Sequence, residues 1–227
     1  MLNRLNAAKV LVTETGLDKS EDLPAASTPL SVQLGPELWQ RYRELAGNDL
    51  AEDVEHEAPA VAILRLGARF EDTLSALDKE IEFVATAQGI RVIGLETSAF
   101  QNALLTRWLD TRALRVLIQT TENVDEIRKE TTDDLTHYCQ GTDDDPGYEA
   151  AERAEMLGAG YTEAELGQFE EELLFDRNRD WIPKLAPILA EGNAFIAVGA
   201  DHLRGDEGVP ALLRDEGYRV ERLTPPR

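Results

Sequence analysis

The sequence of 227 residues predicts a helix-rich α/β fold, with α+β as the alternative, in which helices pack around a central mixed, partly parallel sheet. Three observations lead to this expectation. Short β-prone runs are widely separated, amphipathic helical segments fill the intervals, and the last three elements follow the order strand, helix, strand. That order favours a right-handed crossover and parallel pairing. Because this length suits one domain, we expect residues 1–227 to form a single domain.

Four runs are predicted as strands from their β-branched and apolar residues. They are 8–16, 90–96, 194–200 and 218–223. The first two share a feature, because the apolar part of each is followed by a glutamate. The third leads into a Gly- and Asp-rich turn.

The segments between these runs show helical periodicity and the residues that begin and end helices. Pro36 lies just inside the start of one segment and Gly47 just past its end. Pro183 lies inside another, where it predicts a kink or a break near Trp181. The predicted helical segments are 35–47, 58–89 with two helices, 99–139, 161–192 and 208–216.

Composition narrows the classes of function. There are 44 acidic and 23 basic residues, and the net charge of −21 disfavours nucleic acid and anionic membrane surfaces as main partners. No run approaches the roughly 20 apolar residues that span a bilayer. The N-terminus as written carries no export signal, so the chain as written would be cytoplasmic, and the compartment of the protein stays open. The single Cys139 excludes an internal disulfide.

His202 is the histidine whose context points to a site. The chain leaves an apolar strand through Gly199 and reaches this imidazole at the carboxyl end of the strand, where open α/β sheets hold ligands. The alternative is a polar residue that caps the turn. His56, in an acidic stretch, is expected to be solvated, and His137 to lie near a helix end.

Glu14 and Glu96 follow the first two β-prone runs, so both should emerge at the edge of the sheet. A carboxylate beside a histidine can form part of a metal ligand set or an acid–base pair. With so many acidic residues in the chain, each glutamate could equally be an ordinary surface residue.

Arg177 and Asn178 lie inside an otherwise amphipathic helical run, FDRNRDW. Arginine can fork onto a carboxylate and asparagine can polarise a carbonyl, which makes both candidate site residues. The alternative is an exposed helical turn in which Asp176 and Asp180 form ion pairs with Arg177 and Arg179.

Four blocks, in this order along the chain, resemble the TraB/GumN family, which is related to the Tiki metalloproteases. LNAAKVLVTET resembles the segment with an early Glu, and LDKEIEFVATAQGIRVIGLETSAFQNALL the central block with Leu-Glu-Thr and then a Gln. LLFDRNRDWIPKL resembles the Arg-Asn block, and FIAVGADHLRGDEGVPALLRDEGYRVERL the C-terminal G-x-x-H block.

The resemblance implies a metal-dependent, peptidase-like hydrolase that acts on a peptide or small-molecule substrate through a divalent metal ion. Carried over by position, His202 and Glu14 would be metal ligands, and Glu96 the general base or a further ligand. Arg177 and Asn178 would hold the substrate or stabilise the oxyanion.

One feature departs from the family pattern. The first G-x-x-H of the family lies upstream of the early Glu, and no histidine precedes His56 here. Either the chain as given lacks the N-terminal strand, the leader and that motif, or it is a variant that no longer binds metal through two histidines. In both cases we expect feeble or no hydrolysis, although family members are often exported to the periplasm or membrane. The alternative function is a non-catalytic module of the same fold that binds a small ligand, haem or a partner protein.

Overall fold

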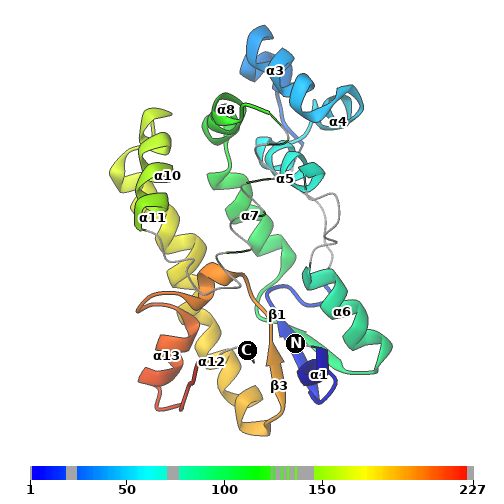
Figure 1. Ribbon diagram of the computed structural model, residues 1–227, viewed down its shortest axis with the longest axis vertical. Helices are drawn as coiled ribbons and strands as arrows, with labels where there is room; N and C mark the ends of the chain where they lie inside the picture. Colours follow the sequence, from blue (N-terminus) through cyan, green and yellow to red (C-terminus); the bar gives the residue numbers. More distant parts are fainter. Residues whose placement is uncertain are drawn as a thin grey trace. The chain divides into compact units, whose positions relative to one another are not determined.

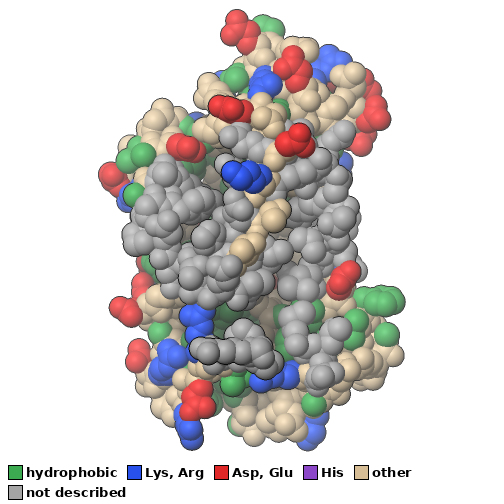
Figure 2. Space-filling model, viewed as in Figure 1, with side chains coloured by type: hydrophobic (Ala, Val, Ile, Leu, Met, Phe, Trp, Pro, Cys, Tyr) green, Lys and Arg blue, Asp and Glu red, His purple; other side chains and the backbone are tan. Residues whose placement is uncertain are grey.

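The computed structural model describes residues 2–18, 25–70, 77–123, 125, 129, 132, 136 and 146–223. The chain forms two compact units, each assembled from separate stretches of sequence. The first unit comprises 1–20, 76–101 and 168–227, and the second 21–75 and 102–167. On the described part of the face shown in Figure 2, Asp and Glu side chains are spread widely, and several adjoin one another at the upper right edge.

The first unit is built on a three-stranded parallel sheet with the order β2-β1-β3. Its strands are β1 (Val10–Thr13), β2 (Arg91–Gly94) and β3 (Ala194–Ile196). Val10 pairs with Arg91 on one side and with Ala194 on the other. Every residue of the central strand β1 is buried, as its uninterrupted run of β-branched and apolar residues predicts for a strand covered on both faces.

Helices cover both faces of this sheet (Figure 1). On one face Val10 and Val12 pack in a cluster with residues of α12 and α13, and on the other Leu11 packs with residues of α1 and α6. The four helices are α12 (Asp176–Glu191), α13 (Val209–Asp215), α1 (Leu2–Leu5) and α6 (Leu77–Ala87). The alternation of side chains along β1 therefore divides its residues between two apolar clusters.

The second unit is helical among its described residues. Its helices are α2 (Leu30–Leu34), α3 (Pro36–Ala46), α4 (Asn48–Val54), α5 (Pro59–Phe70), α8 (Thr111–Thr120), α10 (Pro146–Gly158), most of α7 (Ser98–Trp108) and most of α11 (Glu163–Glu170). Its core contains the fully buried Tyr42, whose hydroxyl donates to the carbonyl of Ala62 at 3.1 Å. The polar end of this ring is thereby satisfied inside an apolar cluster.

The predicted α/β class is confirmed, and so are the helix at 35–47 and the two helices within 58–89. None of the helices described is long and apolar enough to cross a membrane. Within the described part of the helix expected over 99–139, one helix ends at Trp108 and another begins at Thr111, because Asp110 caps the new start at α8 by accepting from the amides of Arg112 and Ala113. His137 and Cys139 lie outside the described residues.

One expectation for the C-terminal part is wrong. The strand predicted at 218–223 does not form, and Tyr218 and Val220 pack as irregular chain against the apolar cluster of β1. Of the kink or break predicted near Trp181, the break is absent, because α12 continues through Pro183 with one face buried against the sheet. The irregularity lies earlier, in the π-helical turn η1 (Glu171–Phe175), where the amide of Asp176 donates to the carbonyl of Glu171.

Candidate functional site

The five predicted site residues all lie in the first unit and meet at the carboxyl edge of its sheet. Glu14 directly follows β1, Glu96 follows β2 and His202 lies in the short turn η2 (Ala200–Leu203) after β3. Arg177 and Asn178 come from the first turn of α12. Parallel strands end at one edge of a sheet, and that geometry brings the two carboxylates and the imidazole together.

The strand ends that carry the two glutamates are held together by their backbones. The carbonyl of Glu14 accepts from the amides of Leu95 and Glu96, each at 2.8 Å. Gly16 has φ +61°, and a Cβ there would lie 2.6 Å from the amide nitrogen of Gly94. Only glycine allows both this conformation and this approach, so Gly16 lets the two strand ends that carry Glu14 and Glu96 lie close together.

The guanidinium of Arg177 lies at the centre of the site, and all five of its N–H groups have acceptors. Nη2 donates to Glu14 Oε2 at 2.6 Å and to Glu96 Oε1 at 2.7 Å, and Nε donates to Glu96 Oε2 at 3.0 Å. Nη1 donates to the carbonyl of Leu173 at 2.7 Å and faces His202 Nε2 at 3.1 Å. An arginine has five such donors, so this one is saturated.

The two carboxylates differ in their surroundings. The side chain of Glu96 is 4 % exposed, and its oxygens accept from Arg177 and, at 3.3 Å, from Trp181 Nε1. The side chain of Glu14 is 19 % exposed and has two further donors. Its Oε1 accepts from the amide of Gly199 at 2.8 Å and its Oε2 from Gln101 Nε2 at 2.7 Å. Glu14 is therefore the more accessible carboxylate of the pair.

The hydrogen bonds of Asn178 fix the tautomer of His202. Asn178 Nδ2 donates to the carbonyl of Glu207 at 2.9 Å, so its Oδ1 is the atom 2.6 Å from His202 Nδ1. An amide oxygen only accepts, which places the ring proton on Nδ1 and leaves the lone pair on Nε2. That lone pair faces Arg177 and lies 4.0 Å from Glu14 Oε1.

The electrostatics of the site keep the imidazole neutral. Burial lowers the pKa of His202 to about 4, and Arg177 adds to this decrease while Glu14 opposes it. The side chain is 5 % exposed and its ring centroid lies 4.4 Å from that of Trp181. At neutral pH the ring is thus an uncharged base whose Nε2 lone pair faces the guanidinium of Arg177.

A neutral imidazole oriented through its other nitrogen is the form in which histidine binds a metal, and a carboxylate lies beside it. His202 and Glu14 thus fit two positions of a metal ligand set. Over the described part of the chain, no group of three or more His, Cys, Asp or Glu side chains is placed to hold a metal ion.

The ion-pair alternative considered for the Arg-Asn block applies to Arg179. This side chain pairs with Asp176 at 2.8 Å, with Glu207 at 2.5 Å and with Glu171. Arg177, one residue before Asn178, instead points toward the sheet. The helix thus carries Arg179, which forms the outer ion pairs, close to Arg177, which lies in the candidate site.

Sequence reasoning assigned no role to several groups that the structure brings into the site. Gln101 and Trp181 each donate to a site carboxylate, and the Leu173 carbonyl accepts from Arg177. Trp181 could have been found from its helical spacing, because it lies one turn after Arg177 and shares its face. The carbonyl of Leu173 belongs to the π-helical turn, for which the sequence offers no clear signal.

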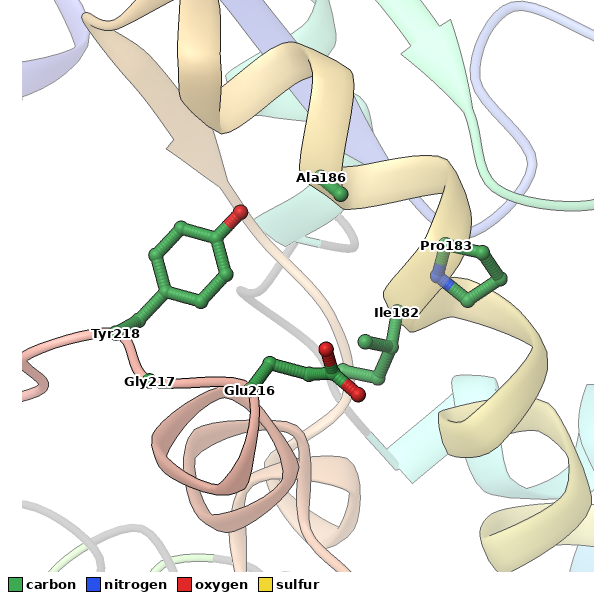
Figure 3. A pocket seen from close by; sticks show the side chains of 6 residues that line it. All are labelled: Ile182, Pro183, Ala186, Glu216, Gly217 and Tyr218. Atoms are coloured by element: carbon green, nitrogen blue, oxygen red, sulfur yellow. The ribbon is translucent and has the colours of Figure 1, made fainter.

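A separate cavity of about 290 Å³ lies beside α12 and contains none of the five site residues (Figure 3). Its walls come from α12 and from the chain after α13, and they are Ile182, Pro183, Ala186, Glu216, Gly217 and Tyr218. The candidate site is a buried polar cluster with Glu14 at its more exposed side.

Fold and site together define a class: an α/β protein with a buried Arg–carboxylate–histidine cluster at the carboxyl edge of a parallel sheet. The chain belongs to the TraB/PrgY/gumN family, whose model matches residues 2–222. No curated protein and no solved structure matches the chain.

Proposed function

We propose that this site belongs to a metal-dependent, peptidase-like hydrolase, and that His202 Nε2 and a carboxylate oxygen of Glu14 supply two of the metal ligands. The observation that carries the proposal is the state of His202: a buried, neutral imidazole with its proton held on Nδ1 by Asn178 and its Nε2 lone pair near Glu14. A divalent cation held there supplies Lewis acidity toward a substrate carbonyl.

The remaining residues of the cluster receive roles from their contacts. Asn178 uses both its oxygen and its nitrogen in hydrogen bonds within the protein, so we assign it to the orientation of His202 rather than to direct contact with substrate. Glu96 has both oxygens bonded to Arg177 and is almost fully buried, so we assign it to the placement of that guanidinium. The general-base role expected of Glu96 would require one of these bonds to open.

Metal titration tests the proposal directly. Metal-stripped protein should bind one equivalent of Zn²⁺ or Mn²⁺ by calorimetry, and His202→Ala and Glu14→Gln should lose most of this binding. His56→Ala is the matched control, because it removes an imidazole from the other unit. Equal stoichiometry and affinity in wild-type protein and His202→Ala would reject the metal role.

A second candidate is a non-catalytic module that binds a small ligand, haem or a partner protein. It is favoured by the saturation of Arg177, because a cluster whose donors are all used inside the protein can serve as a fixed part of the fold. Haem titration followed in the Soret band separates the two candidates. A shifted Soret band that is lost in His202→Ala supports the module, and the hydrolase proposal expects no change.

A further inference from the structure

We propose that the cavity beside α12 binds a small organic cation, an ammonium group with an apolar body, between the ring of Tyr218 and the carboxylate of Glu216. The volume of the cavity, about 290 Å³, is close to the lower end of pockets that hold small molecules. The inference does not depend on the proposed function, because none of the five site residues lines this cavity.

The end of α13 places these two side chains at the cavity. Gly217 has φ +89°, and the amide of Tyr218 donates back to the carbonyl of Leu213 at 2.9 Å, as in a helix that ends at a glycine. The chain therefore turns at Gly217, with Glu216 before the turn and Tyr218 after it. Figure 3 shows both side chains extending from this turn toward α12.

The opposite wall of the cavity is apolar. Ile182, Pro183 and Ala186 of α12 form this wall, and the side chains of Ile182 and Ala186 are half-buried. The ring of Tyr218, also half-buried, stands across from the helix. An alkyl group between the helix and the ring would lose contact with water on two sides, which favours an occupant with an apolar body.

The polar groups around the cavity are mainly acceptors. The backbone amides of Glu216, Gly217 and Tyr218 all donate to carbonyls of α13. Pro183 has no amide proton, and the other two lining residues lie inside α12, where amides bond within the helix. Among the residues that the structure describes, no hydrogen bond or ion pair engages the carboxylate of Glu216 or the hydroxyl of Tyr218. The cavity thus offers an occupant a carboxylate and a hydroxyl.

Charge sets the preference of the cavity for a cation. Glu216 carries the one charge among the described residues that line it. The arginines closest in sequence are engaged elsewhere, because Arg214 Nε donates to the carbonyl of Val220 at 3.4 Å and Arg219 pairs with Glu221. An ammonium group is attracted by the face of an aromatic ring and by a carboxylate. An anion in the same place would be repelled by the carboxylate.

Titration with three probes of similar shape tests the inference on wild-type protein. The probes are choline, its uncharged analogue 3,3-dimethylbutan-1-ol and the anion 3,3-dimethylbutanoate, and binding is followed at low ionic strength through the amide resonances of Gly217 and Tyr218. Choline should bind roughly 3- to 30-fold more tightly than the uncharged analogue, the range that a cation–π contact provides, and the anion should bind most weakly. Equal affinity for choline and the uncharged analogue, or no shift of these two resonances, overturns the inference.

Two variants locate the binding. Glu216→Gln changes an exposed side chain and keeps its size, and it should lower the affinity for choline roughly two- to fivefold without affecting the uncharged analogue. Glu221→Gln is the matched control, because this exposed glutamate does not line the cavity, and its affinity should equal that of wild type. Ala186→Leu adds bulk to the helical wall and should abolish binding of both probes. Wild-type choline affinity in Glu216→Gln, or in Ala186→Leu shown by circular dichroism to be folded, overturns the inference.

Discussion

Arg177→Met should strongly destabilise the first unit, and the structure indicates which atoms carry the cost. Glu96, 4 % exposed, loses two hydrogen bonds from the guanidinium and keeps the longer bond from Trp181. Glu14 is more exposed and keeps Gly199 and Gln101. The penalty therefore falls on one buried carboxylate, and removal of one partner from a buried pair costs roughly 3–5 kcal/mol.

The double variant Glu96→Gln/Arg177→Met provides the comparison that isolates this charge. A neutral amide at position 96 needs less solvation, so the cost should fall to about 1–2 kcal/mol, the scale of hydrogen bonds lost without a stranded charge. The difference between single and double variants is the energy of the unpaired carboxylate.

Urea unfolding followed by hydrogen exchange in the β1 peptide measures the stability of the first unit without a signal from the second. The reasoning is refuted if Arg177→Met costs less than about 1 kcal/mol, as an exposed pair would. It is also refuted if the double variant is as unstable as the single one.

Three further predictions address the imidazole and the strand ends. The pKa of His202 is lowered to about 4 in the folded protein. Between about pH 4 and 6.5 the unfolded chain therefore binds a proton that the folded protein does not, so the free energy of unfolding should fall by about 3 kcal/mol as the pH decreases from 6.5 to 4. A His202→Gln variant whose stability changes with pH in this window as that of wild type does would contradict this. Asn178→Ala should weaken Zn²⁺ binding roughly 10- to 100-fold in calorimetry, because the ring orientation is lost, and unchanged affinity would remove its positioning role. Gly16→Ala should lower the urea midpoint much more than Gly192→Ala, because both have positive φ but only the first places its Cβ 2.6 Å from backbone; equal costs, each about 1 kcal/mol, would show that the conformation and not the close approach matters.

The sequence allowed the convergence of Glu14, Glu96 and His202 to be predicted, because each follows a β-prone run and parallel strands end at one edge. The same logic failed for residues 218–223. A β-prone run becomes a strand only if its backbone pairs with a neighbouring strand, and here Tyr218 and Val220 find apolar contacts in the cluster of β1 without such pairing. Burial of these side chains stabilises the segment without strand pairing. The sequence pattern does not distinguish a paired strand from an irregular segment whose apolar side chains are buried.

The inward placement of Arg177 was harder to predict than its identity as a site residue. Arg177 and Arg179 lie in the same helical turn with acidic neighbours, and local sequence favours ion pairs for both. Their separation depends on the π-helical turn before α12 and on acceptors distant in sequence, which are Glu14 and Glu96. Long-range charge partners of this kind leave no periodic signal.

The cluster both holds the strand ends together and carries the proposed chemistry, and a single substitution affects both roles. Arg177 links the chain after β1, through Glu14, with the chain after β2, through Glu96, and it contacts His202 after β3. Loss of any member therefore disturbs the carboxyl edge of the sheet, where the amide of Gly199 also depends on Glu14. Loss of activity alone could then reflect a loosened strand end rather than lost chemistry. Hydrogen exchange in the β1 peptide separates the two explanations, because a loosened strand end should exchange faster, whereas lost chemistry alone should leave the exchange rate unchanged.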